Sequence, residues 1–196
     1  MMDRHEISRE NILSMETYAI ERRDRRREAV AMKRNRRMEV GPVAAFYFEN
    51  YDTMWHQVHE MLYIERGGEE QIADELAAYN PLIPKGHELI ATVMFEIDDE
   101  VRRRNFLGRL GGVEETGFLK FADEKIRGIA EADLDRTTAE GKASAVQFLR
   151  FPFSQSQISK FSSKEVEVII GFEHTNYSHM AVMSQSVRKA LVTDFD

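Results

Sequence analysis

The segment HELIATVMFEID, residues 87–98, constrains the fold more than any other part of the chain. One face carries Leu89, Ala91, Val93, Phe95 and Ile97, and the opposite face carries Ile90, Thr92, Met94 and Glu96. This alternation is typical of a β-strand with one face against a core. The chain is therefore expected to build a sheet with one well-covered face.

Further strands are predicted at 43–50, 116–121, 125–130, 144–151 and 165–172. Helices are predicted in the N-terminal region up to about residue 38, at 53–66, 69–79, 99–110 and 154–161, and after Thr175 or Asn176 as cap. Several connections have hairpin length, which favours antiparallel pairing. We expect an α+β fold with a mixed or mainly antiparallel sheet of about five to six strands, packed helices and a basic N-terminal helical arm.

The domain organisation follows from length and charge. With 196 residues and 42% hydrophobic content, the chain suits one globular domain. Gly41 and Pro42 end the N-terminal helix, because proline disfavours helix in the residue before it. We therefore predict a basic helical arm at 1–40 and a single α+β domain at 41–196. The arm has a net charge of +3 within a chain of net charge −7.

Composition excludes several classes of site. The chain has no cysteine, so a metal would need His, Asp or Glu ligands. There is no glycine-rich phosphate loop, no nucleophile elbow and no dinucleotide fingerprint. No apolar run approaches the length that spans a bilayer, and the N-terminus is charged, so we expect a cytoplasmic protein without a membrane segment.

The segment MWHQVHEMLYIER, residues 54–66, places His56, His59 and Glu60 within one helical turn. The pattern does not match H-E-x-x-H, in which two histidines bind zinc and the glutamate acts as base. Nor does it match the E-x-x-H of di-iron bundles. Histidines that flank an apolar stripe are more often half-exposed packing residues.

The segment EHTNYSH, residues 173–179, places His174 and His179 after a strand, where side chains often project into a pocket. Neutral imidazole is a common metal ligand, so these histidines with Glu60 form a candidate site for a divalent Zn, Fe or Mn ion. Glu49 and Glu96 are further candidate carboxylates, because both lie in largely apolar segments. The alternative interpretation is that this segment only caps the last helix.

An arginine cluster at 22–37 includes Arg25, Arg26, Arg27, Arg36 and Arg37. Such density can bind phosphate, including nucleic acid. Glu21, Asp24 and Glu28 interleave it, however, so helical ion pairs or docking on an acidic partner subunit explain it more simply.

Several segments together resemble a bacterial family known as domain of unknown function 3501. They are AFYFENYDT, QVHEMLYIER, DELAAYNPLIPKGHEL, IATVMFE, SAVQFLRF and HTNYSH. The residues that match the family pattern are Glu60, Glu65, Arg66, Tyr79, Asn80, His174, Tyr177 and His179. His56 and His59 stand where other members typically have other residues. The resemblance implies at most an accessory role beside rubrerythrin-like and iron–sulfur oxidoreductase-like redox proteins.

Two functional hypotheses follow from the sequence. The first is a metal-binding or redox-accessory protein with Glu60, His174 and His179 as ligands and Tyr177 close by. The second is a homodimeric, non-catalytic interaction module whose Arg-rich helix binds an acidic partner or, less readily, nucleic acid. Whether the protein is an enzyme stays open, since carboxylates and histidines also serve as acid–base partners.

Overall fold

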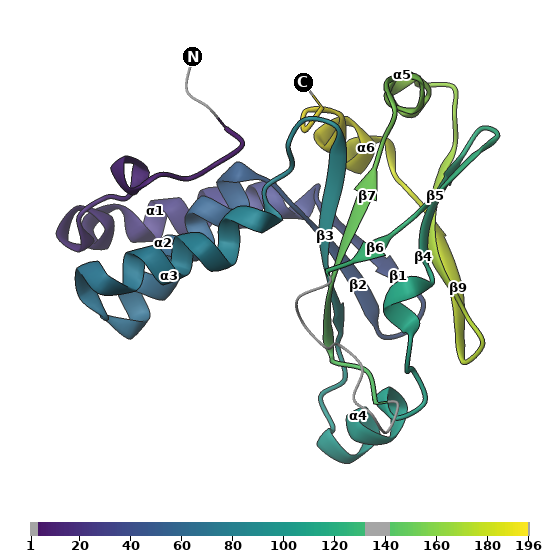
Figure 1. Ribbon diagram of the computed structural model, residues 1–196, viewed down its shortest axis with the longest axis horizontal. Coiled ribbons are helices and arrows are strands. Elements are labelled where there is room, and N and C mark those ends of the chain that lie inside the picture. The colour runs from purple at the N-terminus through teal and green to yellow at the C-terminus, as the bar shows by residue number, and fades with distance from the viewer. Residues whose placement is uncertain (1–3, 132–141, 196) are drawn as a thin grey trace.

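The computed structural model describes residues 4–131 and 142–195. It consists of a layer of helices joined to a pair of antiparallel sheets, so the α+β prediction is confirmed (Figure 1). The helical layer extends sideways from the sheets and holds a core of its own, which includes Met54, Val58, Leu62 and Ile72.

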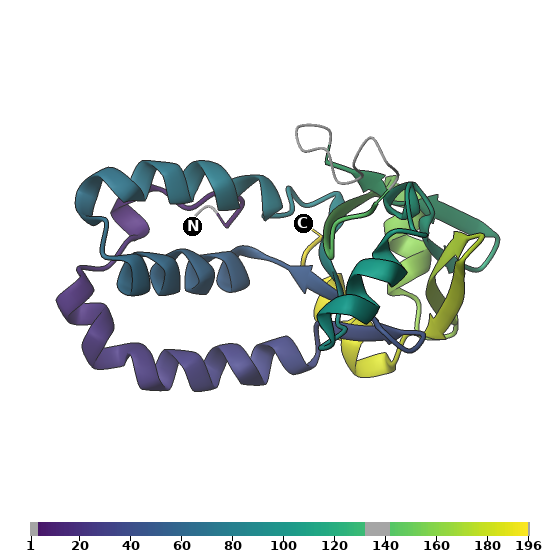
Figure 2. The same cartoon turned by 90° about the horizontal axis from the view of Figure 1, so that it is seen from below.

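The helical layer consists of α1 (Met15–Arg34), α2 (Tyr51–Glu65), α3 (Gly68–Tyr79) and the 3-10 turns η1 (Arg9–Asn11) and η2 (Asn80–Leu82). In Figure 2, α2 lies between α1 and α3. The side chains of Ser14 and Asn50 accept hydrogen bonds from the free N–H groups at the starts of α1 and α2. Among the helices of the described ranges, none has both the length and the apolar character needed to cross a membrane.

The five-stranded sheet has the order β1-β2-β3-β7-β6, with all neighbours antiparallel. Its strands are β1 (Arg37–Val40), β2 (Ala44–Glu49), β3 (Glu88–Phe95), β7 (Val146–Pro152) and β6 (Ile129–Ala130). The four-stranded antiparallel sheet has the order β5-β4-β8-β9. Its strands are β5 (Glu124–Arg127), β4 (Gly117–Phe121), β8 (Val168–His174) and β9 (Tyr177–Val182).

The main core lies between the inner faces of the two sheets and includes Phe46, Phe48, Val93 and Phe172. The predicted faces of β3 are confirmed, because Leu89, Ala91, Val93 and Phe95 all belong to this core. Three short helices complete the described part of the chain: α4 (Glu100–Leu107), α5 (Gln155–Ser162) and α6 (Gln185–Val192), with a 3-10 turn η3 (Val113–Glu115).

The structure corrects two predicted elements. The last helix does not begin at Thr175 or Asn176, because residues 174–177 form the tight turn of the β8–β9 hairpin and α6 begins at Gln185. The N-terminal helix ends at Arg34, and residues 37–40 form strand β1. The proposed boundary at residue 40 thus falls inside the β1–β2 hairpin, and α1 packs along α2 as part of the helical layer.

Candidate functional site

A cavity of about 380 Å³ lies where the helical layer meets the outer face of the five-stranded sheet. Strands β2, β3 and β7 form its floor, and the ends of α1, α2 and α3 form its roof. Its lining residues are Lys33, Arg36, Tyr47, Phe48, Glu49, Met54, Gln57, Tyr79, Leu82, Thr92, Met94, Val146 and Phe148.

The two-residue period of the strands determines which side chains form the floor of the cavity. Inward side chains of β2 and β3 enter the core, so Tyr47, Glu49, Thr92 and Met94 project from the outer face. Tyr47 is the register partner of Thr92, and Glu49 lies two residues further along β2. The same alternation brings Phe148 of β7 to this face, where it packs against the core of the helical layer.

Glu49 is the buried carboxylate of this floor, with 7% of its surface exposed. The hydroxyl of Thr92 donates a hydrogen bond of 2.8 Å to its Oε1. Within residues 4–131 and 142–195, the Glu49 side chain has no other hydrogen bond and no ion pair. A carboxylate can accept several hydrogen bonds, so Glu49 has acceptor capacity left to offer to a molecule in the cavity.

Arg36 holds the backbone at the end of β2, next to Glu49, in place. Its guanidinium donates to the carbonyl oxygens of Phe48 at 3.0 Å and of Glu49 at 3.3 Å, and it pairs with Asp194. Burial raises the pKa of Asp194 to about 6, against the opposing effect of the Arg36 charge. Arg36 therefore ties the end of β2 to the C-terminal segment, and its donors are already used.

The roof adds polar groups from three helices. Burial raises the pKa of Tyr79, whose side chain is hydrogen-bonded to Gln57. Lys33, in the last turn of α1, is half-buried, and its ammonium group makes no hydrogen bond or ion pair with the described residues. Met54 supplies an apolar contact surface from α2. The cavity thus combines apolar walls with a few polar groups, as small-molecule sites generally do.

Glu60, the first of the predicted metal ligands, is engaged within the helical layer. Arg22 binds both of its oxygens, at 2.8 and 2.9 Å, and the hydroxyl of Tyr18 donates to Oε1 at 2.9 Å. These hydrogen bonds and the Arg22 charge lower the pKa of the Glu60 carboxyl. Glu60 therefore holds α1 against α2.

His174 and His179 lie on the β8–β9 hairpin, in the sheet remote from α2 (Figure 1). The Nδ1 of His174 accepts from the backbone N–H of Asn176 at 3.2 Å, and Nε2 lies 3.1 Å from the Gly111 carbonyl. The structure does not bring these histidines together with Glu60. In the ranges it describes, it places no group of three or more His, Asp or Glu side chains suited to a metal ion.

His59 and His56 take part in the packing of the helical layer. His59 is fully buried, and its Nδ1 donates to the Trp55 carbonyl at 2.7 Å while its Nε2 accepts from the Leu13 N–H at 3.1 Å. Burial lowers the pKa of His59 to about 4. Burial also lowers the pKa of His56, which lies 3.4 Å from the Tyr18 hydroxyl.

The remaining single candidates have local partners. The Tyr177 hydroxyl donates to the Val40 carbonyl at 2.6 Å, so it clamps β9 to the β1–β2 hairpin. Glu96 accepts from Tyr47 and pairs with Arg37 at 2.9 Å at the rim of the cavity floor. Glu65 accepts a hydrogen bond from Gln71, and Arg66 ends α2 in the left-handed conformation.

The five arginines of the predicted cluster have different environments in the structure. Arg36 is buried and Arg37 is bound to Glu39 and Glu96, so neither offers a free anion site. Arg25 lies over the Trp55 ring, 5.2 Å from its centroid. Arg26 and Arg27 are exposed, and Arg27 pairs with Asp24 at 3.1 Å. These two are the exposed members of the five candidates.

Sequence reasoning named Glu49 as a reserve metal ligand and missed Thr92, Gln57 and Lys33 as its companions. A signal for Thr92 was present, because alternation assigns it to the face opposite the core of β3. Gln57 and Lys33 join the cavity through the packing of helices on the sheet, which has no local signature.

Comparison with known proteins identifies the family to which the chain belongs. A family model described as a protein of unknown function, DUF3501, matches residues 6–195, so the chain belongs to this family. No curated protein matches. A crystal structure of a novel protein of unknown function from Burkholderia pseudomallei K96243 is 36% identical, with a TM-score of 0.89, and the match covers 97% of this chain and 99% of that one.

Proposed function

We propose that this protein binds a small organic molecule in the cavity between the helical layer and the five-stranded sheet. The observation that carries the proposal is Glu49, a buried carboxylate with a single hydrogen-bond partner on the wall of a cavity of about 380 Å³. Oε1 of Glu49 accepts from Thr92, and neither carboxylate oxygen is buried without a partner, so the carboxylate opens to the cavity and keeps acceptor capacity for a ligand.

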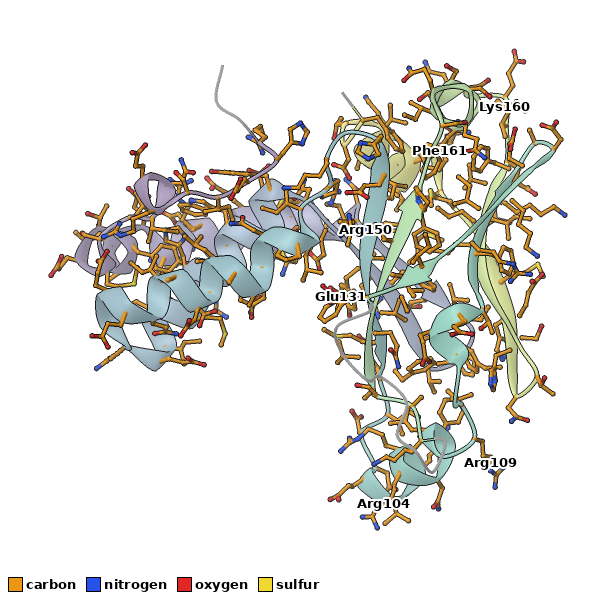
Figure 3. The ribbon with its side chains drawn as sticks, viewed as in Figure 1. Arg104, Arg109, Glu131, Arg150, Lys160 and Phe161 are labelled. Atoms are coloured by element: carbon orange, nitrogen blue, oxygen red, sulfur yellow. The ribbon has the colours of Figure 1, made fainter. Side chains whose placement is uncertain are left out.

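The way the cavity is built supports this proposal. Its floor lies on three paired strands, and the junction is braced from outside by Arg150, which donates to the Pro81 carbonyl at 2.9 Å and pairs with Glu88 at 2.5 Å (Figure 3). Side chains on such rigid elements keep their positions better than side chains on loops. A preformed cavity also lowers the ordering cost of binding.

Methionine methyl groups offer a direct test. Met54 of the roof and Met94 of the floor line the cavity, whereas Met180 lies on the exposed face of β9. With ¹³C-labelled methionine methyls, titration with benzyl alcohol as probe should shift the NMR signals of Met54 and Met94 and leave that of Met180 in place. Unchanged signals of Met54 and Met94 at millimolar probe would contradict the proposal.

A pair of valine variants makes the test specific. Val146→Trp places a large ring on the cavity floor and should abolish the shifts of the Met54 signal. Val182→Trp adds the same ring to a strand in the other sheet, at a position 58% exposed, and should leave them unchanged. Equal binding by both variants would place the probe elsewhere.

A metal-binding or redox-accessory role has less support. Its three proposed ligands are Glu60, His174 and His179, and Glu60 already binds Arg22. The family match and the similar crystal structure both concern proteins of unknown function. Elemental analysis of the purified protein, with His174→Ala as control, remains the direct measurement.

Docking of an acidic partner on α1 is the second candidate function. The helix packs on α2 along one side only, and its open side carries Ile20 and Val30, 84% and 65% exposed, with Arg23, Arg26 and Arg27 beside them. Exposed apolar residues among cations are typical of a contact surface for an anionic partner.

Salt-dependent binding of a polyanion tests this second function. Fluorescence anisotropy with labelled poly-glutamate and with a DNA oligonucleotide should show binding that weakens as salt increases. Arg23, Arg26 and Arg27 changed to Gln should remove it. The matched control changes Arg102, Arg104 and Arg109 to Gln in and just after α4, a basic group at the far end of the sheets (Figure 3). Binding to neither probe would refute the role.

A further inference from the structure

We propose that the ligand of the cavity carries a protonated amine that pairs with Glu49. This inference rests on the proposed function and deepens it, because it assigns the head group of the molecule. The assignment comes from the burial of Glu49, from the lack of an ion pair between its carboxylate and any described residue, and from the aromatic and apolar walls of the cavity.

Comparison with the other buried acids of the chain shows what Glu49 lacks. Glu88 is 3% exposed and pairs with Arg150 at 2.5 Å, and the carboxylate of Asp194, 4% exposed, pairs with Arg36. Glu49 is also buried, at 7% exposed, and it has no cationic partner among the described residues. Buried charges in proteins are normally paired, so the cation for Glu49 is best supplied from outside the chain.

Two cationic side chains near Glu49, those of Arg36 and Lys33, do not pair with its carboxylate. Arg36 directs its donors to the carbonyls of Phe48, Glu49 and Ala190 and to Asp194, so it binds the backbone of Glu49 and leaves the carboxylate to others. Lys33 lies at the last turn of α1 and forms no ion pair with Glu49. An incoming ammonium group can therefore reach the carboxylate without displacing an existing salt bridge.

The walls suit a cation with an apolar body. The rings of Tyr47, Tyr79 and Phe148 line the cavity, and aromatic faces attract ammonium groups. Tyr47 already shows this interaction, since the Arg37 guanidinium lies 5.4 Å from its ring centroid. Met54 and Met94 offer polarizable apolar contacts for the rest of the molecule. A carboxylate ligand would instead meet like charge at Glu49.

Three probes with the same ring and different head groups test the inference: benzylamine, which is cationic at neutral pH, neutral benzyl alcohol and anionic benzoate. Dissociation constants come from the ¹³C-methyl shifts of Met54 and Met94. Benzylamine is expected to bind at least tenfold more tightly than benzyl alcohol, and benzoate more weakly than both. Equal affinity for the amine and the alcohol, or tightest binding of benzoate, would overturn the inference.

Variants separate the head group from the cavity. Glu49→Gln should abolish the preference for benzylamine and keep the affinity for benzyl alcohol within about twofold. Glu165→Gln makes the same change of net charge at an exposed position in the segment before β8 and should keep the preference. If benzyl alcohol binds and the preference for the amine is absent, the inference fails and the proposed function stands. If no probe shifts Met54 or Met94, both fail.

Discussion

Protonation of His59 is expected to destabilise the helical layer. The ring is fully buried, and both nitrogens are used: Nδ1 donates to the Trp55 carbonyl, and Nε2 accepts from the Leu13 N–H. A second proton would have to sit on Nε2, where it would face the Leu13 N–H and would place a charge in a buried site. The folded state therefore disfavours the imidazolium, which is why the pKa of His59 falls to about 4.

The sign and size of the effect follow from linkage. Between its unfolded pKa of about 6.5 and its folded pKa of about 4, His59 binds more protons in the unfolded state than in the folded state, so the free energy of unfolding falls as the pH falls through this window. At about 1.4 kcal/mol for each pH unit, the full loss is about 3 kcal/mol, and about 2 kcal/mol of it is lost by pH 5.

Trp55 is the single tryptophan of the chain and its ring centroid lies 3.8 Å from that of His59, so its fluorescence reports unfolding of this region directly. Urea denaturation of wild type and His59→Gln at pH 7 and pH 5 gives, for each protein, the decrease in the free energy of unfolding between these two pH values. Glutamine can hydrogen-bond but does not titrate. Wild type should lose about 2 kcal/mol more than the variant between these pH values. A parallel loss in both proteins would refute the assignment of the pH dependence to His59.

Two further stability predictions concern the sheets. Asp194→Asn leaves the guanidinium of Arg36 buried without its counterion and should lower the free energy of unfolding by about 3 to 5 kcal/mol, measured by urea denaturation at neutral pH. Gly41→Ala should lower the melting temperature much more than Gly68→Ala, although both glycines have positive φ: a Cβ at Gly41 would lie 2.6 Å from His179 Cγ, whereas a Cβ at Gly68 meets nothing within 4 Å. Similar melting temperatures for the two variants would show that the contact is relieved cheaply.

Strand periodicity was sufficient to predict much of the fold. The two faces of β3 were assigned correctly because alternation is local and Leu89 and Val93 both needed cover. The hairpin of residues 174–177 was missed for an equally physical reason. Ser178 and His179 are exposed in β9, and a short edge strand with polar residues has no clear alternation, while Asn176 suits a helix cap as well as a turn.

The candidate site was less predictable, because chemically suitable residues can be satisfied by near neighbours. Glu60 lies in an apolar segment, which suggested a ligand. Arg22 on the adjacent helix, however, donates hydrogen bonds to both of its carboxylate oxygens. A sequence shows neither which helix packs beside which nor which charges are paired by that packing. Glu49 and Glu60 looked equivalent in the sequence, and only tertiary packing gave Glu60 a cationic partner and left Glu49 with none among the described residues.

The position of Glu49 also depends on a local junction of two elements. Glu49 is the last residue of β2, and Asn50 is the N-cap of α2, so no loop separates the floor of the cavity from its roof. A strand places successive side chains on opposite faces, so a one-residue shift of β2 would turn the carboxylate of Glu49 into the core and turn Phe46 and Phe48 out of it. The Arg36 bonds to the carbonyls of Phe48 and Glu49 hold this register at its end. The buried pair of Arg36 with Asp194 thus does more than stabilise the C-terminus, because it keeps the carboxylate directed into the cavity.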